Sequence, residues 1–167
     1  IMHSNGGFDV IIGNPPYVEV NENLPYSLDK LITSKCGNLY GNCIERGFTL
    51  KTKGYFGFII PVAITCSKRM QKVIDFFNKK SSITYFANFD DRPGKLFEMI
   101  QHLRATIFIA KTTPRTNSNE KFFSTKYNRW YSECRASLFN NIVYQDVYNI
   151  VKEYIVPKIS YDVEASI

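Results

Sequence analysis

Four short runs of apolar residues are separated by polar stretches along the chain. Each run has five to nine residues and is bounded by Gly, Pro or polar residues. The first run is nearly continuous in apolar side chains, which is typical of a strand that is buried on both faces of a sheet, and the second run also predicts a buried strand. The fourth run alternates enough to be an edge or antiparallel strand. The pattern therefore predicts strands at residues 8–12, 55–60, 83–89 and 104–112.

The segments between the first three runs carry helical spacing. Residues 66–80 place four apolar side chains at i, i+3, i+4 and i+7, which form one helical face. These four are Met70, Val73, Ile74 and Phe77. Residues 38–54 show a similar spacing, with Asn38 and Gly54 placed as capping residues. Residues 18–37 are mixed and polar, and we interpret them mostly as loop.

The predicted order is strand, helix, strand, helix, strand, strand, which indicates an α/β sheet with right-handed crossovers. Residues 90–103 are too few for a crossover helix, so the last strand is expected to be antiparallel. Residues 112–121 are a polar connector. Beyond them a further helical pattern predicts a C-terminal helical extension that ends at Pro157. Its apolar face consists of Val147, Val151, Tyr154 and Ile155.

The first apolar run ends abruptly in rigid backbone. The sequence FDVIIGNPPY, residues 8–17, passes from strand-forming residues to two prolines, which lack the N–H that a central strand needs. Ligands of α/β sheets bind beyond the carboxyl ends of the strands. The sequence PVAIT, residues 61–65, follows the second run at the same end. Both segments therefore point to one crevice.

The residues of this NPPY turn can hold an amino group on a planar ring. Pro15 and Pro16 stiffen the backbone. The Asn14 side chain and the Pro15 carbonyl offer two acceptors, which suit the two donors of an –NH2 group. Tyr17 adds a flat face for stacking. Holding both N–H bonds out of the ring plane localises the nitrogen lone pair, so attack on a methyl sulfonium carbon needs positioning more than a strong base.

The sequence FDVIIGNPPYV resembles the catalytic motif of class I S-adenosylmethionine-dependent amino-methyltransferases, above all the DNA adenine-N6 type of Eco57I-like, type IIG restriction–modification enzymes. The resemblance covers roughly residues 8–139. It implies a partial Rossmann-like methyltransferase sheet, in which Asn14 and the Pro15 carbonyl hold the N6 amine and Tyr17 stacks on a flipped adenine. Phe97 is a candidate for the second face against the base, with core packing as the competing interpretation.

The cofactor half of that family is missing from the sequence. Its glycine-rich turn has no counterpart here, since Gly6-Gly7 lies too close to the NPPY strand. We therefore expect residues 1–112 to be the catalytic half of a methyltransferase domain, and residues 113–167 a linker and the start of a helical or DNA-recognition region. The chain alone should bind S-adenosylmethionine weakly or not at all, and should not turn over. The open sheet edge at the first strand makes self-association a hazard.

The charge agrees with a nucleic-acid partner. Among 167 residues, 21 Lys and Arg face 15 Asp and Glu, for a net charge of +6. This balance favours an anionic partner, here double-stranded DNA. Arg129, Trp130 and Arg135 mix cations with an aromatic ring, which suits DNA binding. An equal alternative is that they anchor the linker onto the catalytic domain.

Cysteine and histidine spacing predicts no metal site, because the four cysteines and two histidines do not match a zinc-binding pattern. We find no membrane span and no signal peptide, and together with the modest cysteine content this favours a cytoplasmic protein.

Two other functions stay open. The NPPY turn also occurs in enzymes that methylate a glutamine amide in release factors, and in some RNA guanine methyltransferases. Alternatively, the chain is a non-catalytic module that binds DNA or a partner subunit. The basic charge and the C-terminal region favour DNA as the substrate.

Overall fold

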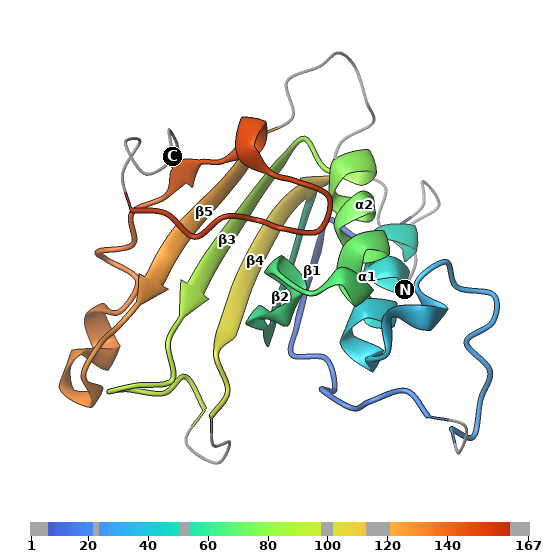
Figure 1. The fold of residues 1–167 in the computed structure, drawn as a ribbon, viewed down its shortest axis with the longest axis horizontal. Helices are drawn as coiled ribbons and strands as arrows, with labels where there is room; N and C mark the ends of the chain where they lie inside the picture. Colours follow the sequence, from blue (N-terminus) through green and yellow to red (C-terminus); the bar gives the residue numbers. More distant parts are fainter. Residues whose placement is uncertain (1–6, 22–23, 51–53, 98–101, 113–120, 161–167) are drawn as a thin grey trace.

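A computed structural model of the chain describes residues 7–21, 24–50, 54–97, 102–112 and 121–160. Its centre is a six-stranded mixed sheet with the strand order β1-β2-β4-β3-β5-β6 (Figure 1). The strands are β1 (Val10–Gly13), β2 (Gly54–Pro61), β3 (Ile83–Phe89), β4 (Ala105–Thr112), β5 (Lys121–Asn128) and β6 (Gln145–Asp146). The described α-helices are α1 (Leu39–Leu50) and α2 (Gln71–Lys80). The short 3-10 helices are η1 (Ser34–Cys36), η2 (Val62–Thr65), η3 (Lys68–Met70), η4 (Ser132–Ser137) and η5 (Tyr148–Ile150).

Four strands of the sheet run in one direction. β1 pairs with β2 in parallel, β3 pairs with β5 in parallel, and β4 lies antiparallel between β2 and β3. The carboxyl ends of β1, β2, β3 and β5 and the amino end of β4 therefore meet at one edge, which we call the C-terminal edge. Both the NPPY turn and residues 61–65 lie there, as the sequence predicts.

The main core lies between one face of the sheet and the two α-helices (Figure 1). Alternate residues of the central strands, such as Phe56 and Phe108, are fully buried against apolar residues of α2, such as Ile74. The chain after β6 also crosses this face, and its Val147 and Val156 belong to the same core. Burial of large aromatic side chains supplies much of the stabilisation, since each removes about 150–250 Å² from water.

The opposite face of the sheet is only partly covered. A smaller cluster forms around Ala87, Phe89 and Trp130, between β3 and the chain that follows β5. Over β1 the face is open, and the side chains of Val10 and Ile12 are 56% and 80% exposed. The prediction that this first strand is buried on both faces is therefore wrong for the described residues. No strand among the described residues pairs with the outer edge of β1. The open edge is thus present, and self-association through it stays a prediction.

The predicted α/β order is confirmed, with shifted ends. β4 is antiparallel but internal rather than an edge strand. The helix predicted at residues 38–54 ends at Leu50, residues 51–53 lie outside the described residues, and Gly54 begins β2 instead of capping the helix. Most of the polar connector predicted at 112–121 also lies outside the described residues.

The helix predicted over Val147 to Ile155 is wrong. The segment contains only the short η5 and a turn in which Lys152 and Ile155 exchange backbone hydrogen bonds, with Glu153 at a positive φ of 49°. The N–H groups of Val147 and Val156 donate to carbonyls of β5 and η2 instead. The chain instead crosses the core without forming a helix. Of the four residues of the predicted face, Val147 is fully buried, whereas Ile155 is 44% exposed.

Strand β5, which extends the sheet past residue 112, was not predicted from the sequence. Its polar residues Ser124 and Thr125 are buried, and they are bonded to Asn88 of β3 at 2.8–3.1 Å. Buried polar groups that satisfy one another in this way do not produce an apolar run. The boundary between residues 1–112 and 113–167 as functional units stays a prediction.

Candidate active site

The NPPY turn begins where β1 ends, at Gly13. Asn14 is exposed, Pro15 is buried and Tyr17 is half-buried. Because prolines cannot donate to a sheet, the chain leaves β1 at this point. The residues after the turn are tied to the start of α1, where the N–H of Leu39 donates to the Val18 carbonyl at 2.9 Å. The turn is therefore fixed at both ends, with its asparagine facing solvent.

The Tyr17 hydroxyl joins the turn to β2. It lies 2.7 Å from Oδ1 of Asn14 and 2.9 Å from the backbone oxygen of Ile59. A phenol has one proton, so it donates fully to one of these two acceptors at a time. Burial raises the pKa of Tyr17 to about 12, so the phenol stays protonated at neutral pH.

Two aromatic rings stand edge-on to Tyr17. The Tyr40 ring of α1 lies 6.3 Å from it at 88°, and the Phe97 ring lies 6.4 Å from it at 72°. Tyr40 is buried in the main core, whereas Phe97 is half-buried. The structure thus brings Phe97 to the NPPY turn, and its role against a base stays a prediction. Sequence reasoning missed Tyr40, because its place in a helical pattern carried no sign of the turn.

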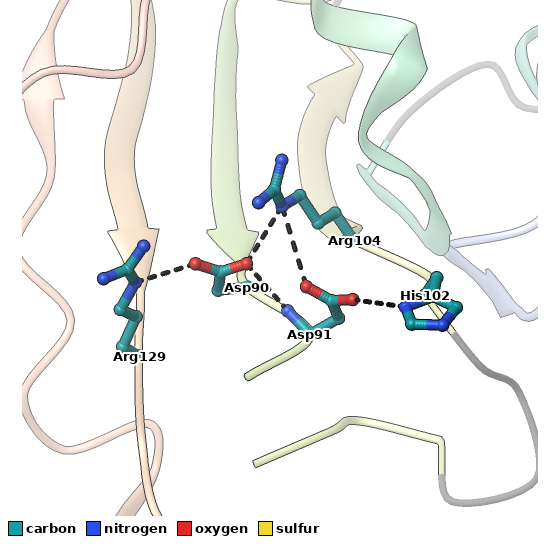
Figure 2. Close-up of polar contacts among 5 residues, drawn as sticks. All are labelled: Asp90, Asp91, His102, Arg104 and Arg129. Atoms are coloured by element: carbon teal, nitrogen blue, oxygen red, sulfur yellow. Dashed lines mark hydrogen bonds and ion pairs between the residues drawn. The ribbon is translucent and has the colours of Figure 1, made fainter. Parts of the chain in front are cut away.

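A charged cluster lies farther along the C-terminal edge, where β3 ends and β4 begins (Figure 2). Asp90 is 4% exposed, and its carboxylate accepts hydrogen bonds from Nε of Arg104 at 2.9 Å and Nε of Arg129 at 2.7 Å. Asp91 adds a contact of 3.7 Å to Nδ1 of His102. The two carboxylates therefore contact three basic side chains, those of His102, Arg104 and Arg129.

The Asp90 carboxyl stays ionised in this environment. Burial raises its pKa, but hydrogen bonds from Arg104, Arg129 and the Asp91 backbone outweigh burial and hold the pKa at about 2. The sequence alone did not mark this aspartate as a site residue. The signal it lacked was the pairing of strands, which brings Arg104 and Arg129 to the aspartate from distant positions.

The three residues predicted as a weak DNA-binding set have different surroundings. Trp130 is buried in the smaller cluster, and the Arg135 guanidinium lies 5.6 Å from its ring. Arg135 also donates to the backbone oxygens of Lys95 and Leu96. These contacts hold the segment after β5 against the loop that leads to Phe97. DNA contacts of Arg129, Trp130 and Arg135 stay predictions.

Within the described ranges, no group of three or more His, Cys, Asp or Glu side chains is placed to hold a metal ion. None of the described helices is long and apolar enough to cross a membrane.

Comparison with known proteins adds a family and a fold. The model of the Eco57I restriction-modification methylase family matches residues 1–97. A comparison with curated proteins finds no match.

Among solved structures, the chain is similar to parts of three larger proteins. DrdV, from a DrdV–DNA complex, is 16% identical with a TM-score of 0.60, over 82% of this chain and 17% of that one. A nuclease-deletion mutant of the Type ISP restriction-modification enzyme LlaGI, in complex with a DNA substrate mimic, is 18% identical with a TM-score of 0.60 over the same shares. The ATP-dependent Type ISP enzyme LlaBIII, bound to DNA, is 17% identical with a TM-score of 0.54, over 70% and 10%.

These likenesses confirm the predicted α/β fold. The chain spans 10% to 17% of the length of these three proteins.

Proposed function

Because the chain belongs to the Eco57I restriction-modification methylase family, we propose that it supplies the base-binding part of an enzyme that methylates N6 of adenine in double-stranded DNA. The observation that carries this proposal is the pairing of Asn14 and Tyr17 in a rigid turn at the C-terminal edge. Ligands of α/β sheets bind at this edge.

The turn offers the contacts that an adenine amino group needs. Asn14 is exposed, so its amide can exchange the Tyr17 hydroxyl for the N6 amine by rotating about its side-chain bonds. The backbone oxygen of Pro15 is the second acceptor. Together they direct both N–H bonds and localise the lone pair on N6, which is the atom to be methylated.

The aromatic rings of the site would hold the base once it leaves the DNA stack. Flipping costs a few kcal/mol, and stacking on an aromatic ring returns about 1–3 kcal/mol per base. Tyr17 would supply one face and Phe97 the other. Because the two rings are now edge-on at 6.4 Å, binding of a base between them requires at least one ring to turn.

S-adenosylmethionine is the methyl donor in this proposal. The described residues do not fit a complete cofactor site, because β1 is an edge strand and no glycine-rich turn leading from a strand into a helix is found among them. We therefore assign no residue of this chain to the cofactor.

The test is methyl transfer from labelled S-adenosylmethionine into unmethylated DNA by the intact natural protein that contains this chain. Asn14→Ala should lower the rate on the order of 10²-fold, as expected when a positioned polar contact to the reacting group is lost. Asn14→Asp keeps an acceptor oxygen and should retain more activity. The matched control is Asn140→Ala, at an exposed asparagine in the chain after η4. Equal activity of wild type and Asn14→Ala would refute the role of the turn.

A further inference from the structure

A second feature of the C-terminal edge is a basic hollow of about 870 Å³. Arg92, Lys95, Arg104 and Arg129 line it, against the carboxylates of Asp90 and Asp91. The hollow thus carries an excess of positive charge, in contrast to the NPPY turn, whose groups are neutral. Positive charge gathered in a concave surface attracts anions.

The two arginines that Asp90 holds are only partly used by it. Each donates to the carboxylate through Nε, and no dashed line in Figure 2 joins a terminal guanidinium nitrogen to Asp90. The side chains of Arg104 and Arg129 remain 52% and 70% exposed. A guanidinium has five N–H donors in a planar fork that matches phosphate oxygens. Asp90 therefore holds two guanidinium groups whose side chains keep at least half of their surface exposed to solvent.

The hollow is joined to the NPPY turn by one short loop. Asp90 begins this loop, Lys95 lines the hollow within it, and Phe97 contacts the Tyr17 ring. Neighbouring strands of a sheet lie about 4.8 Å apart, so the strand ends that carry Arg104 and Arg129 stand roughly 10–20 Å from the end of β1 along the edge. That span is comparable to a few nucleotides of a DNA strand, for which the axial rise is about 3.4 Å each.

We propose that Arg104 and Arg129, positioned by Asp90, bind a backbone phosphate of the DNA strand whose adenine enters the NPPY turn. This assignment rests on the proposed function, because it takes DNA as the substrate. Asp90 is a positioning residue, and the two guanidinium groups make the contact. Phosphate contacts fix the register of a protein on DNA and carry no sequence information, which suits a site beside a flipped base.

The experiment measures binding of the intact natural protein to double-stranded DNA at several salt concentrations by fluorescence anisotropy. Each phosphate neutralised adds about 0.9 to the slope of log K against log salt. The variant Arg104→Gln with Arg129→Gln should lower the magnitude of this slope by about one and weaken binding roughly tenfold at low salt.

The matched control is Lys79→Gln with Lys80→Gln. It also removes two positive charges, from exposed residues at the end of α2. Because these residues precede the amino end of β3, they lie at the edge of the sheet opposite to the hollow. It should keep the wild-type slope. The proposed phosphate contact would be overturned if the arginine variant and the lysine variant had equal slopes of log K against log salt, or if the arginine variant kept the wild-type slope.

Loss of both arginines leaves the buried Asp90 carboxylate without its partners, which can prevent folding. A third variant, Asp90→Asn with both arginine substitutions, replaces that charge with a neutral amide and should show the same reduced slope. A wild-type slope in this variant overturns the proposal. A second result would also overturn it. If millimolar inorganic phosphate raises the melting temperature of the wild type but not of the arginine variants, while wild type and variants have equal slopes for DNA binding, the hollow binds free phosphate and not DNA.

Methyl transfer is read separately in the same preparations. If the arginine variant shows the predicted change in slope but the wild type transfers no methyl group, the phosphate contact is supported and the proposed function is contradicted. If the wild type methylates adenine but all variants have the same slope, the proposed function is supported and the phosphate contact is contradicted.

Discussion

The hydroxyl of Tyr17 lies 2.7 Å from Oδ1 of Asn14, so the two side chains of the NPPY turn that are assigned to the base contact each other. The same hydroxyl reaches the Ile59 backbone oxygen at 2.9 Å. This arrangement separates two roles of Tyr17: its ring can stack on a base, whereas its hydroxyl orients the asparagine and the turn.

Tyr17→Phe removes the hydroxyl and keeps the ring, so kcat/KM for methyl transfer should stay within about fivefold of wild type, the change expected for one hydrogen bond of about 1 kcal/mol. Tyr17→Ala removes the stacking face and should lower kcat/KM roughly 5- to 150-fold, which corresponds to about 1–3 kcal/mol. Tyr26→Ala, at an exposed tyrosine, is the control. Equal losses in Tyr17→Phe and Tyr17→Ala would contradict a stacking role for the ring.

Phe97→Ala should weaken productive binding of DNA, because the ring beside Tyr17 is lost as a second face for the base. We expect kcat/KM to fall about tenfold, with a smaller loss in Phe97→Tyr, which keeps an aromatic face. The control is Phe139→Ala, which truncates a ring that is 62% exposed. Steady-state methyl transfer at limiting DNA makes the measurement. Wild-type kinetics in Phe97→Ala would assign this ring to packing alone.

Glu45 should be important for stability. Its buried carboxylate accepts hydrogen bonds from the N–H groups of Ile32 and Thr33 and from the Thr33 hydroxyl, at 2.7–3.1 Å. Glu45→Ala leaves these donors without their acceptor and should lower the free energy of unfolding by about 1–3 kcal/mol. Urea unfolding of the chain measures this loss. The exposed Glu133→Ala should change stability by less than about 0.5 kcal/mol, and a loss that small in Glu45→Ala would contradict the structure.

Asp90 should make stability depend on acid pH. Its pKa is lowered from 3.8 to about 2 in the folded chain, so the folded state loses its proton more readily than the unfolded state. The resulting stabilisation is present above about pH 4 and is lost as the pH falls toward 2. Asp90→Asn lacks it and should show a shallower fall in the urea midpoint over this range. Parallel curves for wild type and Asp90→Asn would show that the carboxyl is not selectively stabilised in its charged form.

The sequence predicted those elements in which the pattern of apolar residues matches the side chains that the fold buries. The apolar runs of β2 to β4 and the helical face of α2 lie against the main core, so their side chains report their structure directly. β1 contacts this core through Ile11, whereas Val10 and Ile12 are exposed. The rigid turn after β1 was also predictable from the sequence, because two prolines lack the N–H groups that a strand needs for pairing.

The parts that the pattern missed depend on contacts between distant segments. β5 pairs with β3 and buries Ser124 and Thr125, which bond to Asn88, so no apolar alternation marked this strand. The backbone N–H groups of Val147 and Val156 donate to β5 and η2 and not to carbonyls of a helix. The helical spacing of apolar residues between Val147 and Ile155 was therefore coincidental. For the same reason the partnership of Asp90 with Arg104 and Arg129 became visible only once the order of the strands was known.

The central claim is that the NPPY turn presents an adenine amino group for methylation. Its most direct test is mass-spectrometric analysis of nucleosides from unmethylated genomic DNA, after treatment with the intact natural protein and S-adenosylmethionine. We predict N6-methyldeoxyadenosine with the wild type and a loss on the order of 10²-fold with Asn14→Ala. Methylated deoxycytidine in place of N6-methyldeoxyadenosine, no methylated nucleoside at all, or an undiminished yield from Asn14→Ala would contradict the account.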